Sequence, residues 1–125
     1  METKYIMNLD LDSEKANLVY DEGEINLDLI GMAPYKLFLA SIPYCTATMM
    51  FVMLQENGIW EPKVKIESTF ITDESEIKRL KSISMRIIIS NSPKEIVENA
   101  FLELKKKCAI LNSLSSLIDL SLEVR

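Results

Sequence analysis

One uncharged stretch constrains this chain more than any other feature: no acidic or basic residue occurs from Leu37 to Gln55. About 20 apolar residues are enough to cross a bilayer, so length alone permits a membrane span. The content of the stretch favours a buried core helix, because Pro43 lies near its centre among serine, threonine and tyrosine side chains. A helix that is apolar on nearly every side must be covered all round. A chain of this size achieves this most easily by pairing with a second copy.

Composition sets the class of protein. Of 125 residues, 48% are hydrophobic and 26% charged, with only three Gly and four Pro, which excludes disordered and low-complexity classes. The length predicts a single domain over residues 1–125. The net charge is −5, and the basic residues cluster only at Lys105–Lys107, where they complement the end of a predicted helix. We therefore expect no nucleic-acid partner.

The chain has no histidine, which removes histidine-based acid–base catalysis, Ser–His and Cys–His nucleophile pairs, and histidine-containing metal sites. The two cysteines lie far apart in the sequence and cannot complete a zinc site unaided. We predict no metal and no other cofactor. The first residues lack the apolar segment of a secretory signal, which predicts a cytoplasmic, non-membrane protein whose thiols are reduced at rest.

Alternating apolar and polar residues predict three short strands before the uncharged stretch. They fall at Tyr5–Leu11, Asn17–Tyr20 and Ile25–Leu29, separated by polar turns. In the first of them Tyr5, Met7, Leu9 and Leu11 share one face, the pattern of a half-buried strand. We expect an antiparallel meander.

The uncharged stretch is predicted to be helical from Pro34 to an αL cap at Asn57-Gly58. An interior proline removes a hydrogen bond and clashes with the preceding turn. We therefore expect two helical pieces, with Pro43 in the first turn of the second, where proline is tolerated. Cys45 then lies in that same first turn.

The second half of the chain contains three further strands and one helix. Alternation predicts a hairpin from Val64–Phe70 and Ile83–Ile89, and a closing strand over Ile118–Val124. Between them, a capping box beginning at Ser92 starts a helix that runs to about Lys107. The order βββ-α(α)-ββ-α-β predicts an α+β fold.

The two cysteines are predicted to be chemically unequal. A thiol acts as a nucleophile only as the thiolate, which a helix N-terminus favours and a helix C-terminus disfavours. Cys45 occupies the first kind of place if Pro43 begins a helix, and Cys108 the second. This asymmetry suits oxidation of Cys45 to a sulfenic acid, followed by attack of Cys108 to close a disulfide. The simpler alternative is that Cys45 is a small buried hydrophobe and Cys108 an incidental neighbour.

Four segments carry a family resemblance: Pro34–Ser41, Cys45–Met49, Glu56–Ile59 and Lys107–Leu114. The first three resemble the central motif of the OsmC/Ohr family, Pro-Tyr-Glu-Leu-Leu-Leu-Ala-Ser followed by Cys-Thr and a closing Gly-Ile/Val. The fourth is similar to the family's second motif, Lys-Cys-Pro-Val-His/Asn-x-Leu. The order of elements between the motifs also matches.

The resemblance implies an OsmC-like fold in an intertwined homodimer, with long central helices buried between two sheets and active sites at the subunit interface. It further implies a thiol-dependent peroxidase that reduces organic hydroperoxides. Cys45 would be the peroxidatic thiolate, Cys108 the resolving thiol, and an external dithiol the reductant. An apolar pocket would hold the organic part of the peroxide. Its candidate residues, for each of which core packing is the alternative, are Phe38, Met49, Met50 and Met53.

The chain departs from the family at the groups that activate the cysteine. Peroxidases of the family use an arginine from the N-terminal strands, oriented by a glutamate before the central helix. Here no arginine precedes Arg79, and Tyr35 and Lys36 stand where the acid is expected. Lys36 and Arg86 are the possible cations. These departures keep open a second function, a non-peroxidase dimeric binding or redox-responsive protein with an apolar interface cavity.

Overall fold

A computed structural model describes residues 2, 4, 7–12, 16–20, 23–26, 34–75 and 77–125. The chain divides into two compact units, Met1–Phe38 and Leu39–Arg125. Each unit is described separately below.

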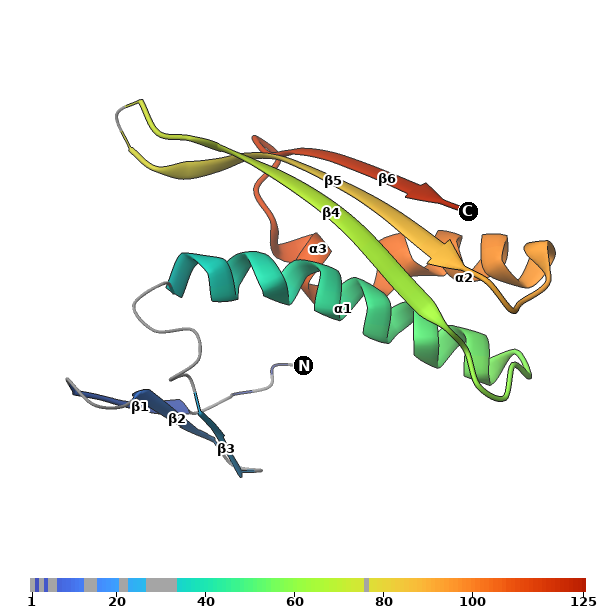
Figure 1. Cartoon of the computed structure of the whole chain (residues 1–125), viewed down its shortest axis with the longest axis horizontal. Helices are drawn as coiled ribbons and strands as arrows, with labels where there is room; N and C mark the ends of the chain where they lie inside the picture. Colours follow the sequence, from blue (N-terminus) through green and yellow to red (C-terminus); the bar gives the residue numbers. More distant parts are fainter. Residues whose placement is uncertain are drawn as a thin grey trace. The chain divides into compact units, whose positions relative to one another are not determined.

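The first unit contains a three-stranded antiparallel sheet in the order β1-β2-β3 (Figure 1). Its strands are β1 (Met7–Leu11), β2 (Ala16–Tyr20) and β3 (Gly23–Asn26). The predicted meander is therefore present. Five residues of the predicted strands lie outside the described residues: Tyr5, Ile6, Leu27, Asp28 and Leu29.

Strand pairing gathers several apolar side chains of this sheet on one face. Leu9 pairs with Leu18, and Leu18 pairs with Ile25, so all three point to the same side. Met7 and Leu9, expected to be half-buried, are each 57% exposed, and Ile25 is also exposed. The opposite face is mainly polar, although the exposed Val19 also lies on it, and it carries a 2.7 Å hydrogen bond from Asn17 Nδ2 to Glu24 Oε2. One face of the sheet thus presents apolar surface to solvent.

The second unit is built on a sheet in the order β4-β5-β6. The strands β4 (Val64–Asp73) and β5 (Arg79–Ile89) form the predicted hairpin, and β6 (Asp119–Val124) pairs with β5 in parallel. Helices α1 (Pro34–Glu56) and α2 (Lys94–Lys107) lie on one side of this sheet (Figure 1). A short helix that the sequence patterns did not predict, α3 (Ala109–Ser113), follows α2.

The core of the second unit lies between the sheet and the two long helices. Alternate β5 side chains point inward, and α1 and α2 each contribute residues three or four apart, as the periods of strand and helix require. Each fully buried aliphatic side chain contributes about 1.5–3 kcal/mol of transfer free energy. The principal buried residues are Ile42, Met50 and Leu54 of α1, Ile83, Met85 and Ile87 of β5, and Val97, Ala100 and Leu104 of α2.

The predicted break at Pro43 is absent. Helix α1 is continuous over 23 residues, with Pro43 inside it, so Cys45 lies at its middle rather than in a first turn. Ile42 and Thr46, on either side of the proline, are both fully buried. Burial on this face offsets the cost of an interior proline, roughly 3 kcal/mol.

The end of α1 is close to the predicted one. The N–H of Gly58 donates to the carbonyl of Gln55, and that of Ile59 to the carbonyl of Leu54, both at 3.0 Å. With Gly58 at φ +91°, these bonds form a Schellman motif. The left-handed conformation explains why glycine stands at this position.

The start of α2 differs from the predicted capping box. The helix begins at Lys94, and Pro93 in an extended conformation occupies the N-cap position that was expected for Ser92. The Ser92 hydroxyl oxygen is buried and has no hydrogen-bond partner among the described residues. The cap signal therefore located the helix but missed its first residue.

Helix α1 is long and apolar enough to span a membrane by length and composition. Core helices of soluble proteins meet the same criteria, and the α1 residues Ile42, Met50 and Leu54 are fully buried in the core of the second unit. The other side of α1 is exposed, and Tyr44 is the most accessible of its large apolar residues at 75%. Within the second unit, the helix is therefore covered on one side only.

Candidate functional site: a pair of thiols

The two cysteines of the chain meet inside the second unit. The Sγ atoms of Cys45 and Cys108 are 3.0 Å apart, and either thiol can donate the hydrogen bond. Both are free thiols, with Cys45 half-buried and Cys108 fully buried. The pair is therefore held at contact distance, with only the Cys45 side partly accessible.

Cys108 occupies the corner between α2 and α3. Its N–H donates to the carbonyl of Leu104 at the end of α2. Its own carbonyl accepts hydrogen bonds from the backbone N–H and the side-chain amide of Asn112. The same Asn112 amide also donates to the carbonyl of Lys106 at 3.3 Å. Asn112 thus ties the last turn of α2 to α3 and fixes the backbone that carries the buried sulfur.

Burial raises the pKa of the Cys108 thiol, and the hydrogen bond and negative charge of Cys45 add to this effect. The backbone N–H groups of Leu111 and Ile110, at the start of α3, act in the opposite direction. The sequence also predicted that Cys108 ionises less readily. It attributed this to the C-terminus of a helix, whereas in the structure the main cause is burial.

The predicted electrostatic advantage of Cys45 requires a helix start at Pro43. Helix α1 has none there, because Cys45 stands at its centre, where the helix dipole has no free N–H groups to offer. What the structure provides for Cys45 instead is the neighbouring thiol of Cys108.

The two candidate cations have separate positions. On β5, Arg86 lies between the buried residues Met85 and Ile87 and therefore points to the opposite side of the sheet from α1. There its Nε donates to Glu123 Oε1 at 2.9 Å. Lys36 is exposed in the first turn of α1, within the first unit. The contacts of Arg86 therefore tie it to the outer face of the sheet rather than to the thiols.

The four candidate pocket residues do not lie together in one pocket. Met50 and Met53 are buried in the core of the second unit, and Met49 packs against that core. Phe38 is exposed in the first unit and stacks on Tyr35, with ring centroids 6.0 Å apart. For Met50 and Met53, the geometry is that of core packing.

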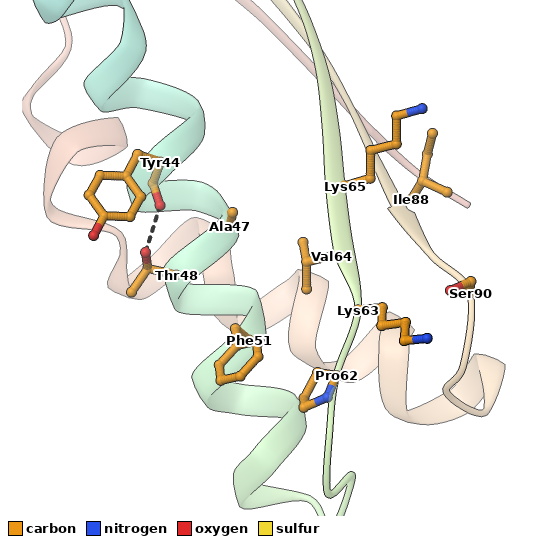
Figure 2. A pocket seen from close by; sticks show the side chains of 10 residues that line it. All are labelled: Tyr44, Ala47, Thr48, Phe51, Pro62, Lys63, Val64, Lys65, Ile88 and Ser90. Carbon is orange, nitrogen blue, oxygen red and sulfur yellow. Dashed lines mark hydrogen bonds between the residues drawn. The ribbon is translucent and has the colours of Figure 1, made fainter.

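A groove of about 660 Å³ lies between the exposed side of α1 and the start of β4 (Figure 2). Phe51 of α1 lies across from Pro62 and Val64, while the ammonium groups of Lys63 and Lys65 are directed away from the helix. Neither cysteine lines the groove. Its α1 residues, Tyr44, Ala47, Thr48 and Phe51, share one side of the helix at three- and four-residue spacing, which was the available sequence signal.

Metal chemistry finds no support in the part of the chain that the structure describes. No group of three or more histidine, cysteine, aspartate or glutamate residues there is placed to hold a metal ion.

The structure is similar to several solved proteins, at sequence identities that establish the fold alone. An OsmC-like protein from Mycoplasma pneumoniae matches with a TM-score of 0.77 at 17% identity, covering 100% of this chain and 98% of that one. A hypothetical protein from Aquifex aeolicus matches with a TM-score of 0.76 at 22% identity, with the same coverage. The organic hydroperoxide resistance protein OhrB of Bacillus subtilis matches with a TM-score of 0.63 at 14% identity, covering 98% of each chain.

No curated protein matches the sequence. The family model for OsmC-like proteins matches residues 24–123, which is most of the chain and includes both cysteines. The solved relatives have the predicted OsmC-like α+β architecture, which confirms the fold class. OsmC-like proteins are soluble, in agreement with a core role for α1. The chain therefore belongs to the OsmC-like family.

Proposed function

We propose that this protein is a thiol-dependent peroxidase that reduces organic hydroperoxides through Cys45, with Cys108 as the resolving thiol and an external dithiol as the reductant. The observation that carries the proposal is the 3.0 Å separation of two free sulfurs, one on α1 and the other at the corner between α2 and α3. If Cys45 and Cys108 served only as small buried hydrophobes, nothing would require their two sulfur atoms to face each other. Family membership and the hydroperoxide resistance proteins among the structural relatives support the choice of substrate.

The reaction balances with these two residues and the external dithiol. The Cys45 thiolate attacks the terminal oxygen of the hydroperoxide, the O–O bond breaks, and the alkoxide leaves as the alcohol after taking a proton. Cys45 is then a sulfenic acid. The Cys108 thiolate attacks its sulfur, hydroxide leaves as water, and a disulfide forms. Two electrons from the external dithiol restore both thiols.

The test treats fully reduced protein with one equivalent of cumene hydroperoxide and follows free thiols and intact mass. We expect loss of both thiols and of two hydrogen atoms, with the Cys45–Cys108 peptide pair recovered as a disulfide. Because the chain contains only two cysteines, the product is assigned without ambiguity. If both thiols survive while the hydroperoxide is unchanged, the peroxidase assignment fails.

The second candidate is a dimeric protein whose Cys45–Cys108 pair responds to redox state without turnover, or which binds an apolar ligand. The observation in its favour is that Arg86, a possible activating cation, is paired with Glu123 on the outer face of the sheet. Catalytic cycling separates the two candidates. With dithiothreitol in excess, a peroxidase consumes cumene hydroperoxide much faster than the uncatalysed reaction does, whereas a binding or redox-responsive protein without peroxidase activity leaves the uncatalysed rate nearly unchanged.

We also propose that the protein is a homodimer. Two apolar surfaces are exposed in a single chain, one on the β1–β2–β3 sheet and the other on α1 beside Tyr44 and Phe51. Monomeric soluble proteins rarely expose large contiguous apolar patches, and a second copy would cover both surfaces. Since the pair of free thiols must be kept reduced between turnovers, we place the dimer in the cytoplasm, which cell fractionation checks.

Leu9→Asp should convert the dimer to monomer, because it would place a charge in a buried apolar interface at a cost of several kcal/mol. Leu9 is 57% exposed in the single chain, so the same substitution would be harmless to an isolated monomer. Asn8→Asp is the matched control, since it adds the same charge to the polar face of the same strand. Sedimentation velocity would read the masses. A monomeric wild-type protein, or a dimeric Leu9→Asp variant, would refute the proposal.

A further inference from the structure

The two sulfurs of the pair differ in accessibility. Cys108 is 0% exposed, whereas Cys45 is half-buried. Cys108 is enclosed in the core cluster that also contains Leu104 and Leu111. The thiols are already at contact distance, so closing a disulfide requires little movement and leaves this difference in place. The enclosed sulfur of Cys108 therefore offers no route to an external molecule, which leaves Cys45 as the candidate point of entry.

The geometry of thiol–disulfide exchange further restricts attack on Cys108. Thiol–disulfide exchange proceeds by attack of a thiolate on one sulfur while the other leaves, with entering and leaving atoms in line. Attack on Cys45 requires approach from the side facing away from Cys108. Attack on Cys108 requires approach from the side facing away from Cys45, through the packed corner between α2 and α3, where Asn112 holds the backbone carbonyl at 2.9 Å.

We infer that the reductant attacks the sulfur of Cys45, so that the mixed disulfide forms on α1 and Cys108 is the leaving thiol. This inference rests on the redox pair of the proposed function. The first reductant thiolate bonds to Cys45 Sγ as the Cys45–Cys108 bond breaks, and Cys108 departs with the electron pair and takes a proton. The second reductant thiolate then attacks its partner sulfur in the mixed disulfide. The reductant leaves as a disulfide and Cys45 as a thiolate.

Backbone N–H groups beside Cys108 help it to leave as a thiolate when Cys45 is attacked. Burial raises the pKa of Cys108 and so opposes its departure as a thiolate, but the N–H groups of Leu111 and Ile110 offset part of that cost. Access decides which sulfur the reductant attacks. The enclosed sulfur of Cys108 cannot be attacked, however readily Cys45 would leave. Cys45 is thus the entry point both for the hydroperoxide and for the reductant.

The test begins from disulfide prepared with diamide, so that it does not depend on peroxide chemistry. Oxidised protein is mixed briefly with glutathione and quenched in acid, which stops exchange by protonating thiolates. Free thiols are then alkylated with N-ethylmaleimide under acidic denaturing conditions, and peptides are mapped by mass. We expect glutathione on Cys45 and N-ethylmaleimide on Cys108, in at least about tenfold excess over the reverse pattern.

Single-cysteine variants provide a matched measurement. The free Cys45 of Cys108→Ser should react with Ellman's reagent at least about tenfold faster than the free Cys108 of Cys45→Ser, and the difference should vanish in urea. Equal or reversed labelling in the native proteins, glutathione mainly on Cys108, or no disulfide with diamide would overturn the inference. If diamide closes the disulfide but cumene hydroperoxide does not, the peroxidase proposal fails while this inference is still tested.

Discussion

Cys45→Ser should reduce hydroperoxide turnover to the rate of the uncatalysed reaction. A serine hydroxyl cannot form the sulfenic acid that stores the oxidising equivalent, and the chain has no histidine to activate it. Turnover is measured as loss of cumene hydroperoxide with dithiothreitol in excess. Because Cys45 is half-buried and serine is nearly isosteric, the fold should be preserved, which circular dichroism would verify.

Cys108→Ser is the informative companion of this variant. It should retain the rate of the first oxidation, since Cys45 is untouched, but the sulfenic acid can no longer close a disulfide. With excess peroxide we expect Cys45 to advance to the sulfinic acid, a gain of two oxygen atoms in intact mass. Full turnover by Cys45→Ser, or identical oxidation products from Cys108→Ser and the wild type, would contradict the assigned roles.

Met50→Ala should lower the free energy of unfolding by about 3 kcal/mol, the usual cost of removing most of a buried side chain and leaving a cavity. Met50 is fully buried in the core of the second unit, although the sequence also allowed it a place in the substrate pocket. The KM for hydroperoxide should change little. Urea unfolding at one fixed protein concentration measures the stability, because association would make it concentration-dependent.

Met50→Leu serves as the control, since a volume-conserving exchange in a core usually costs less than about 1.5 kcal/mol. The two possible roles of Met50 predict different patterns. Core packing predicts a large stability loss in Met50→Ala with near-normal behaviour of Met50→Leu. A raised KM in Met50→Ala, with unchanged stability, would instead place Met50 in the pocket.

Strong local periodicity made most of the fold predictable. Strand β5 shows why: Ile83, Met85 and Ile87 alternate with polar residues, and each of the three is buried in the structure. The end of α1 was equally readable, because Gly58 is the residue that a Schellman motif requires. In these places local preference and tertiary packing favour the same conformation.

The errors occurred where packing overrides local preference or where elements are too short for periodicity. Pro43 predicts a helix break by itself, yet burial of Ile42 and Thr46 on either side of it keeps α1 intact. Helix α3 has five residues, less than two turns, and depends on the hydrogen bonds of Asn112.

The sequence named the two cysteines of the candidate site but not their geometry. Nothing in the spacing of Cys45 and Cys108 fixes a distance between their sulfurs. The expected chemical inequality of the two thiols and the family resemblance suggested that they act together. The position of Arg86 depends on which face of β5 it occupies, and the buried residues on either side of it settle that face. The groove beside α1 requires the three-dimensional path of β4, which no local pattern gives.

The continuity of α1 has a mechanical consequence for a redox pair. A disulfide bond is about 2 Å long, so sulfurs that already stand 3.0 Å apart need to move by only about 1 Å to become bonded. Side-chain rotation and a slight shift of the α2–α3 corner can supply this, while the hydrogen-bonded centre of α1 stays as it is. Oxidation and reduction would then cycle without local unfolding. The backbone of α1 would keep the Cys45 sulfur in one place while the disulfide bond forms and breaks.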